Sequence, residues 1–454
     1  MLVRNGHVVT ESGTFVGDVL IVDGVIVAIG HGLSGDTVID AEGCWVLPGI
    51  VDAHVHTRIG EHSMGDALAE DLPMASRTAL HGGVTTICAY AHSTPDASAI
   101  EVINEQIELG RSSCSVDFAL NAFVRPADDI EATVTQGAAL GVMTFKAQMA
   151  YHSRGMMQED DSLFRIMRAV SSVGGLTLVH PENGRMVDEL ERVERAGGST
   201  HASLLRSAPG VLEAEGMFRA ATIAGIAECP VLFVHLSARE SVALAEWLHN
   251  RPNSNRIFWE TQPHFLVLSN DLLATRGALA KIGPPLREDE DIAEVWRALE
   301  NGILSHITSD HTVRTAAVKL SKPDILDAPY GGFGCTGLLL PLTFALGVQS
   351  GRFGIEDLVR LIATNPAKRY GLYPRKGVIQ PGADGDLVVL PMDGPAVPLV
   401  ADNIPGAADY SLYEEIYSQG FPRDVIRAGT LALRNGEVLE NPPARYLART
   451  SAGG

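Results

Sequence analysis

The chain has 454 residues, of which 46% are hydrophobic, so it can bury a large core. Its length exceeds that of one average domain, and a parallel barrel of about 250 residues with a second domain would account for it. The excess of 55 acidic over 35 basic residues gives a net charge of −20, which argues against nucleic acid or an anionic membrane as a partner, because both require a basic surface.

Both ends of the chain carry short β-strand patterns. Runs rich in β-branched residues, separated by glycine-containing turns, occupy residues 2–9, 18–22 and 25–29, and again residues 385–390, 424–430 and 434–438. Because two β-rich ends flank a different middle, we expect one small β-sandwich domain formed by residues 1–46 and 375–454.

The middle of the chain, residues 47–374, alternates short apolar runs with helical patterns. The predicted strands lie at residues 49–54, 84–88, 116–120, 142–145, 176–180, 231–235, 256–260 and 305–310. Apolar residues at helical spacing are found between them, in residues 97–109, 162–173, 213–227 and 289–301. Eight strands joined by helical connections predict a parallel (β/α)8 barrel, the TIM-barrel architecture of the α/β class.

Polar residues follow these strands at their carboxyl ends, where barrels of this type place their active sites. They are His54 and His56 after the first strand, Lys146 after the fourth, His180 after the fifth, His235 after the sixth and Asp310 after the eighth. Alternate residues of a strand face the same side, so the first two can present imidazoles to one metal ion. A single strand-end histidine is usually a hydrogen-bonded structural residue. Six polar side chains at one opening have no comparably simple structural explanation, so together they predict a metal site.

Lys146 bears on the number of metal ions. A protonated amine beside metal cations would be repelled, whereas carbamylation by carbon dioxide would turn it into an anion able to bridge two metals. Two dications ~3.5 Å apart repel by roughly 5 kcal/mol even in a water-like dielectric, and an anionic bridge offsets this repulsion. The alternative is a lysine in a salt bridge at the barrel mouth.

The five cysteines indicate a reducing compartment. They form no CxxC pair and lie mostly in apolar stretches, and the N-terminus lacks the pattern of a signal peptide. Residues 338–348, the most apolar later stretch, are too few to span a bilayer. We therefore expect a cytoplasmic protein that does not act at a membrane.

Motifs spread over nearly the whole chain resemble those of a known family, the cyclic amidohydrolases of the amidohydrolase superfamily, in particular the D-hydantoinase/dihydropyrimidinase branch. The motifs are Pro48-Gly49-Ile50-Val51-Asp52-Ala53-His54-Val55-His56, Phe145-Lys146-Ala147-Gln148-Met149-Ala150-Tyr151, Val179-His180-Pro181-Glu182-Asn183-Gly184, Glu260-Thr261-Gln262-Pro263-His264-Phe265-Leu266, Pro284-Pro285-Leu286-Arg287, Ser309-Asp310-His311, Asn365-Pro366-Ala367-Lys368 and Gly371-Leu372-Tyr373-Pro374-Arg375-Lys376-Gly377.

The resemblance implies a binuclear zinc centre that hydrolyses a cyclic amide by a bridging hydroxide, opening a hydantoin or dihydropyrimidine ring to an N-carbamoyl amino acid. It implies that His54, His56 and Asp310 bind one zinc, that His180 and His235 bind the second, and that N6-carboxylated Lys146 bridges them. Asp310 would also be the general base and acid. Tyr151 stands where the family uses a tyrosine hydroxyl to stabilise the oxyanion. A homo-oligomer, a tetramer or dimer, is also implied.

The substrate-facing motifs depart from the hydantoinase pattern. Gly283 replaces the usual serine before Pro-Pro-Leu-Arg, and Tyr330-Gly331 stands where the family has Asn-Gly, in segments whose main chain holds the cyclic amide. Gln148 replaces a usual aromatic residue, and Gln262 a usual cysteine. The Pro-His-Phe at residues 263–265 is closer to allantoinases and dihydroorotases, which keeps a ring hydrolase of either type as the alternative.

Arg58 completes a His-x-His-x-Arg pattern. Dihydroorotases and their relatives use such an arginine to grip a substrate carboxylate, a geometry that suits a guanidinium. The alternative for Arg58 is a salt bridge at the rim, and the Ala-Pro-His that dihydroorotases carry near this point is missing after Asp310-His311. A third hypothesis, a non-catalytic scaffold like the dihydropyrimidinase-related proteins, is disfavoured because every ligand position is filled.

Overall fold

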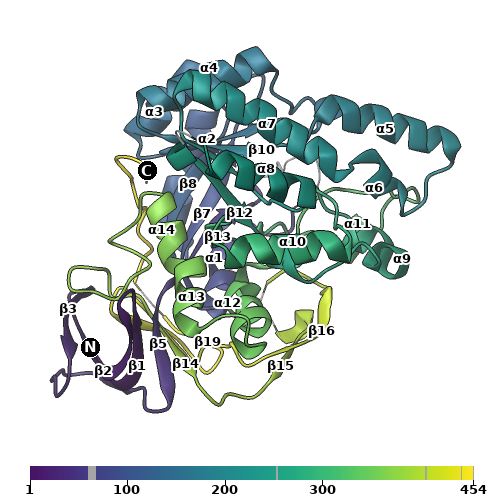
Figure 1. Cartoon of the computed structure of the whole chain (residues 1–454). Coiled ribbons are helices and arrows are strands. Elements are labelled where there is room, and N and C mark those ends of the chain that lie inside the picture. The colour runs from purple at the N-terminus through teal and green to yellow at the C-terminus, as the bar shows by residue number, and fades with distance from the viewer. Residues whose placement is uncertain (60–67, 252–253, 404–405, 441, 453–454) are drawn as a thin grey trace.

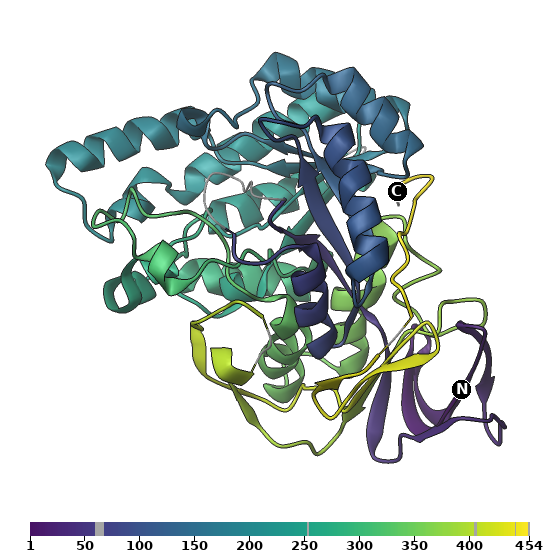
Figure 2. The ribbon, with the colours of Figure 1, turned by 180° about the vertical axis from the view of Figure 1, so that it is seen from behind.

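The computed structural model describes residues 1–59, 68–251, 254–403, 406–440 and 442–452. A large body of strands and helices carries a small β-rich unit at one end, and the N-terminus lies in that unit (Figure 1). The C-terminal segment leaves the β-rich unit and runs back along the large body, as the reverse view shows (Figure 2).

The large body is built on one parallel sheet whose eight strands follow the order of the chain. They are β6 (Ile50–Val55), β7 (Val84–His92), β8 (Asp117–Phe123), β9 (Thr144–Gln148), β10 (Leu176–His180), β11 (Val231–Phe233), β12 (Ile257–Thr261) and β13 (His306–Ile307). An isolated parallel bridge between Val55 and His311 joins the first strand to the segment after the last. The predicted (β/α)8 barrel is therefore confirmed, with each strand within a few residues of its expected place.

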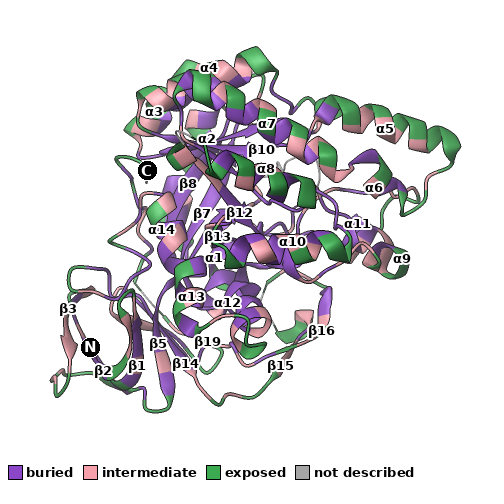
Figure 3. Ribbon diagram, in the orientation of Figure 1, coloured by how far each residue is buried: buried purple, intermediate pink, exposed green. Residues whose placement is uncertain are grey.

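Helices cover the outside of this sheet, and their outer faces are exposed while the strands are buried (Figure 3). In α4, for example, Leu163, Ile166, Met167 and Val170 recur at helical spacing and are all buried. The helices are α1 (Leu72–His81), α2 (Ala99–Ser113), α3 (Ile130–Ala139), α4 (Asp160–Ser172), α5 (Gly184–Gly197), α6 (Ser203–Ser207), α7 (Gly210–Ala227), α8 (Arg239–His249), α9 (Leu272–Arg276), α10 (Asp289–Glu300), α11 (Ala316–Lys319), α12 (Leu339–Thr343), α13 (Ile355–Val359) and α14 (Asn365–Arg369). Within the described residues, none of them has the length and apolar character needed to cross a bilayer.

The small unit contains strands from both ends of the chain, as predicted. One nine-stranded sheet has the order β19-β18-β17-β14-β5-β1-β2-β3, with β4 also paired to β1, and β15 and β16 pair separately. The strands are β1 (Leu2–Thr10), β2 (Gly13–Val22), β3 (Val25–Gly30), β4 (Val38–Asp40), β5 (Cys44–Pro48), β14 (Leu387–Pro391), β15 (Val397–Leu399), β16 (Tyr413–Ser418), β17 (Asp424–Arg427), β18 (Thr430–Arg434) and β19 (Glu437–Val438). The domain boundaries at residues 46/47 and 374/375 stay a prediction.

The last strands differ from the expected runs. Residues 424–430 and 434–438 do not form two strands but three, because hairpin turns interrupt them. Ala428 and Gly429 have φ of 47° and 73°, and Asn435 and Gly436 have 49° and 80°. Two consecutive residues with positive φ are the signature of a tight hairpin turn, so the Asn-Gly and Ala-Gly pairs end strands rather than continue them.

A buried ion-pair network joins the two parts of the molecule at the amino end of the barrel strands. The carboxylate of Asp117, at the start of β8, receives Lys376 Nζ at 2.6 Å and Arg427 Nη1 at 2.9 Å, and Arg445 contacts it from the C-terminal segment. Lys376 also lies 2.5 Å from Asp386. The network therefore lies at the opposite end of the barrel from the predicted metal site.

Hydrogen bonds between the first and last strands close the barrel. His56 N donates to His311 O at 2.8 Å, and His311 N donates to His54 O at 3.2 Å. The buried carboxylate of Asp52 accepts from Ser309 N at 3.1 Å, from Ser309 Oγ at 2.5 Å and from Thr336 Oγ1 at 2.7 Å. We call these contacts the barrel seam, and they bring residues about 250 positions apart into register.

We expect Asp52→Ala to lower the free energy of unfolding by about 3–5 kcal/mol, because it removes a buried acceptor shared by donors of Ser309 and Thr336. Urea denaturation of chelator-treated protein measures this loss without a contribution from bound metal. Asp129→Ala, which removes the cap of α3 at the surface, is the control and should cost about 1 kcal/mol. Equal losses for the two variants would contradict a structural role for the seam.

Candidate metal centre

Three of the predicted ligands meet directly at the seam. The Nε2 atoms of His54 and His56 lie 3.3 Å apart, and Asp310 Oδ1 lies 3.1 Å from the first and 3.3 Å from the second. His54 and Asp310 are buried, and the His56 side chain is 11% exposed. Two imidazole nitrogens and a carboxylate oxygen aimed at one point are a donor set that zinc and related divalent metals take.

The other three predicted ligands lie beside this group. The ring centres of His180 and His235 are 4.3 Å apart, and the ring of His235 is 6.1 Å from that of His54. Lys146 is 1% exposed, and with His56, His180, His235 and Asp310 it lines one cavity of about 70 Å³, here called the metal cavity. The predicted convergence of the six side chains is therefore present, and their assignment as ligands stays a prediction.

The backbone is strained at three residues of this site. Tyr151, His235 and Asp310 have φ of 60°, 46° and 48°, in the left-handed region that residues with a side chain seldom adopt. All three line the metal cavity. Strained non-glycine residues concentrate at functional sites, where the surrounding structure holds them in place.

Two buried glutamates, for which no role was predicted, orient the histidines. His54 Nδ1 lies 2.6 Å from Glu260 Oε1, and the other oxygen of Glu260 is 3.1 Å from His306 Nε2. His180 Nε2 lies 2.6 Å from Glu182 Oε2. In His54 and His180 the carboxylate engages one ring nitrogen and leaves the other for a metal, which is the usual arrangement around metal-bound histidines. Their positions in the sequence could have indicated a role beside the ligand candidates, because Glu260 ends a predicted strand and Glu182 follows His180 by two residues.

Burial and charge set the protonation of the ligand candidates. Burial lowers the pKa of His56 to about 4 and that of His235 well below its ordinary value, so both rings are neutral near pH 7. Burial also lowers the pKa of His54, but the carboxylates of Asp310 and Glu260 outweigh it and raise that pKa to about 9. Burial lowers the pKa of Lys146 to about 8, which makes its neutral amine accessible near neutral pH.

The donor set fits divalent metal ions. Among the described residues, the buried Nδ1 of His235 has no hydrogen-bond partner, although the ring of His235 lies beside that of His180.

A second group of carboxylates, Asp117, Asp384 and Asp386, does not fit a metal in the same way. Lys376 Nζ lies 2.6, 3.0 and 2.5 Å from these three carboxylates and already neutralises them.

The substrate-facing candidates divide into two groups. Tyr151, Gly283 and Tyr330 line the metal cavity, whereas Arg58 is not among the described residues that do so. The guanidinium of Arg58 lies 4.0 Å from Asp71, which corresponds to the rim salt bridge that the sequence left as its alternative. Its contact with a substrate stays a prediction.

Gly283 is required by its closeness to Tyr151. A Cβ atom at residue 283 would collide with the Tyr151 hydroxyl, so glycine at this position lets that hydroxyl approach the backbone. Burial raises the pKa of Tyr151, so its hydroxyl keeps its proton and remains a hydrogen-bond donor.

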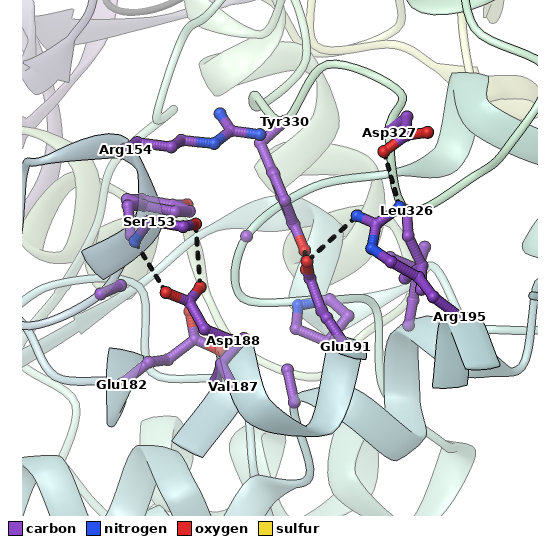
Figure 4. A pocket seen from close by; sticks show the side chains of 16 residues that line it. Ser153, Arg154, Glu182, Val187, Asp188, Glu191, Arg195, Leu326, Asp327 and Tyr330 are labelled. Carbon is purple, nitrogen blue, oxygen red and sulfur yellow. Dashed lines mark hydrogen bonds and ion pairs between the residues drawn. The ribbon is translucent and has the colours of Figure 1, made fainter. Parts of the chain in front are cut away.

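A second cavity of about 180 Å³ adjoins the metal cavity and shares Tyr151, Arg154, Gly283 and Tyr330 with it. Figure 4 shows the Tyr330 hydroxyl directed at Glu191, to which it donates a hydrogen bond of 2.6 Å. Arg195 lies between Glu191 and Asp327 in the same view. Tyr330 therefore lines both cavities while its hydroxyl is held by Glu191.

This fold and donor set define the class of metal-dependent hydrolases built on a (β/α)8 barrel. The model of the amidohydrolase family matches residues 45–431, so the chain belongs to that family. A D-hydantoinase of Ralstonia pickettii is 31% identical over 454 residues, 97% of each chain. An allantoinase of Rubrobacter xylanophilus is 31% identical over 98% of this chain and 97% of that protein. The crystal structure of a dihydropyrimidinase from Brevibacillus agri superposes with a TM-score of 0.91 at 28% identity, covering 100% of this chain and 99% of that one.

We expect the metal affinity of the metal-free protein to rise with pH by up to about tenfold per unit between pH 6 and 8. His54, with a pKa of about 9, is protonated over this range and must release its proton to bind a metal. Competition with a chromophoric chelator for Zn²⁺ measures the slope.

Glu260→Gln provides the matched comparison. It removes one of the two carboxylates that raise the pKa of His54, so less of that imidazole is protonated between pH 6 and 8. The metal affinity of this variant should therefore rise less steeply with pH than that of the wild type. A wild-type affinity that does not change with pH would contradict the protonated state of His54.

Proposed function

We propose that this chain is a metal-dependent hydrolase that opens a cyclic amide, of the hydantoin or dihydropyrimidine type, to an N-carbamoyl amino acid. The observation that carries the proposal is the meeting of four histidines, Asp310 and Lys146 at the mouth of the barrel. The family and the full-length similarity to proteins named D-hydantoinase and dihydropyrimidinase support it.

The proposed centre holds two divalent metal ions, which the family resemblance implies are zinc. His54, His56 and Asp310 would hold one ion and His180 and His235 the other, with N6-carboxylated Lys146 between them. The lowered pKa of Lys146 supports the carboxylation, because the neutral amine is the form that reacts with carbon dioxide. The ions would supply hydroxide at neutral pH and polarise the amide carbonyl.

The chain's own residues move the proton and hold the ring. Neighbouring His54 and His56 outweigh burial and keep the pKa of Asp310 well below its ordinary value, so its carboxylate is ionised and able to accept a proton. We assign it as the general base and then as the acid that protonates the leaving nitrogen. The Tyr151 hydroxyl would donate to the developing oxyanion. Main-chain atoms of Gly283 and Tyr330 would hold the cyclic amide.

The setting of the enzyme is part of the same proposal. We assign it to the cytoplasm as a homo-oligomer, a tetramer or dimer, with a small cyclic amide as its ligand. All five cysteines are buried and unpaired, which supports a reducing compartment. The family resemblance supports the oligomer.

A substrate panel tests the function. The metal-loaded protein should open hydantoin or dihydrouracil, lose this activity on chelation and regain it when metal is returned. Lys146→Met, which has no amine to carboxylate, should be inactive and bind less metal. Preference for dihydroorotate or allantoin would support the alternative ring hydrolases. An allantoinase is among the proteins similar to this chain, at 31% identity. No turnover of any ring by a fully metal-loaded protein would contradict the enzyme and favour a scaffold.

We expect Tyr151→Phe to lower kcat by about 10²–10³-fold with a smaller change in KM, because the hydroxyl acts on the transition state. Gly283→Ala should also lower kcat, because its methyl group displaces the same hydroxyl. The double variant should then be little worse than Tyr151→Phe alone. Tyr446→Phe, which removes a hydroxyl bonded to Leu140 O far from the site, is the control. A fully active Tyr151→Phe would contradict the oxyanion role.

A further inference from the structure

Gln148 lines the metal cavity and holds a buried polar atom without a hydrogen-bond partner in the part of the chain that the structure describes. It is the last residue of β9 and follows Lys146 by two positions, so both side chains face the inside of the barrel. Gln148 is 5% exposed and lines the metal cavity. Among the described residues, its buried Oε1 has no hydrogen-bond partner. A buried acceptor without a donor is costly, and a bound molecule that supplies the donor removes that cost.

The backbone holds this side chain at a fixed depth. Gln158 N donates to Gln148 O at 2.7 Å, and Gln148 is paired with His180 in the register of β9 and β10. Because a strand advances about 3.3 Å per residue, Gln148 lies roughly 6–7 Å nearer the mouth than Lys146. A five-membered ring whose carbonyl is at the metals would therefore present its substituent, not its reacting bond, to Gln148.

The chemistry around Gln148 restricts what that substituent can be. Of the described residues lining the metal cavity, Asp310 alone is a carboxylate, and it lies at the proposed metals. Arg154 and Arg314 also line the cavity, so a cationic substituent in its outer part would meet like charge and no counter-charge. The amide of Gln148 offers one acceptor and one donor group, which match the N–H and C=O of a second amide.

We propose that Gln148 is a specificity-determining residue that selects ring substituents carrying a neutral carboxamide group. Its Oε1 accepts from an N–H of the substituent, and its Nε2 donates to the substituent's carbonyl. The inference rests on the proposed function and narrows its substrate class to hydantoins with a polar amide on the ring carbon.

Three racemic hydantoins of nearly equal size test this inference. They carry carbamoylmethyl, isobutyl and carboxymethyl groups at the substituted ring carbon, so they differ in polarity and charge rather than in volume. We expect the wild-type kcat/KM for the carbamoylmethyl compound to exceed that for the isobutyl compound by about tenfold or more. Gln148→Met, of similar shape but without the amide, should bring this ratio to about one or below. Because the readout is a ratio, a general change in activity cancels.

Gln158→Met is the matched control. Gln158 is a buried glutamine next to Gln148, but its Nε2 donates to Val124 O and it does not line the metal cavity, so its loss should leave the ratio unchanged. Metal content shows whether each variant keeps the site intact, and Gln148→Leu replaces Gln148→Met if the latter loses metal.

Three results would overturn the inference. The first is that the Gln148 variant keeps the wild-type ratio of kcat/KM for the carbamoylmethyl and isobutyl compounds. The second is that the wild type prefers the carboxymethyl compound, and the third is that it acts on all three compounds at equal rates. In each case the opening of unsubstituted hydantoin by the wild type would leave the proposed function standing. A metal-loaded wild type that opens no hydantoin would overturn the proposed function, and this inference with it.

Discussion

The barrel seam is the constraint on which the site depends. His54 and His56 leave the first strand, and Asp310 leaves the last, so these side chains meet only because the two strands are hydrogen-bonded at the mouth. The Asp52 carboxylate fixes this junction by accepting from Ser309 N and Oγ and from Thr336. One buried aspartate thus couples the closing of the fold to the geometry of three ligand candidates.

A surplus of buried negative charge near the seam determines the chemistry. Asp310 and Glu260 both lie against His54, and they stabilise a positive charge at the place where a metal ion would sit. His56 and His235, shielded from water, are neutral and offer lone pairs. The site is therefore arranged to receive cations, with His56 and His235 already neutral and His54 releasing its proton when a metal binds.

Much of this architecture could be predicted from the sequence, because its signals are local. The alternation of strands and helices gave the barrel, and strand ends gave the polar residues of its mouth. Partnerships across the fold could not be predicted in this way. The pairing of Glu260 with His54, 206 positions apart, depends on how the barrel closes. The strand boundaries at Ala428-Gly429 and Asn435-Gly436 were missed because a turn of two positive-φ residues is short compared with the β-branched runs on either side.

The left-handed backbone at Tyr151, His235 and Asp310 has an evolutionary consequence. Glycine would adopt these torsion angles without strain, so selection for a more stable chain alone would tend to replace all three residues. Such replacements would also erase the phenol, imidazole and carboxylate that the cavity presents. At these three residues the stability of the fold and the chemistry of the site make opposite demands. A variant selected for stability alone would therefore be expected to lose its activity through changes here first.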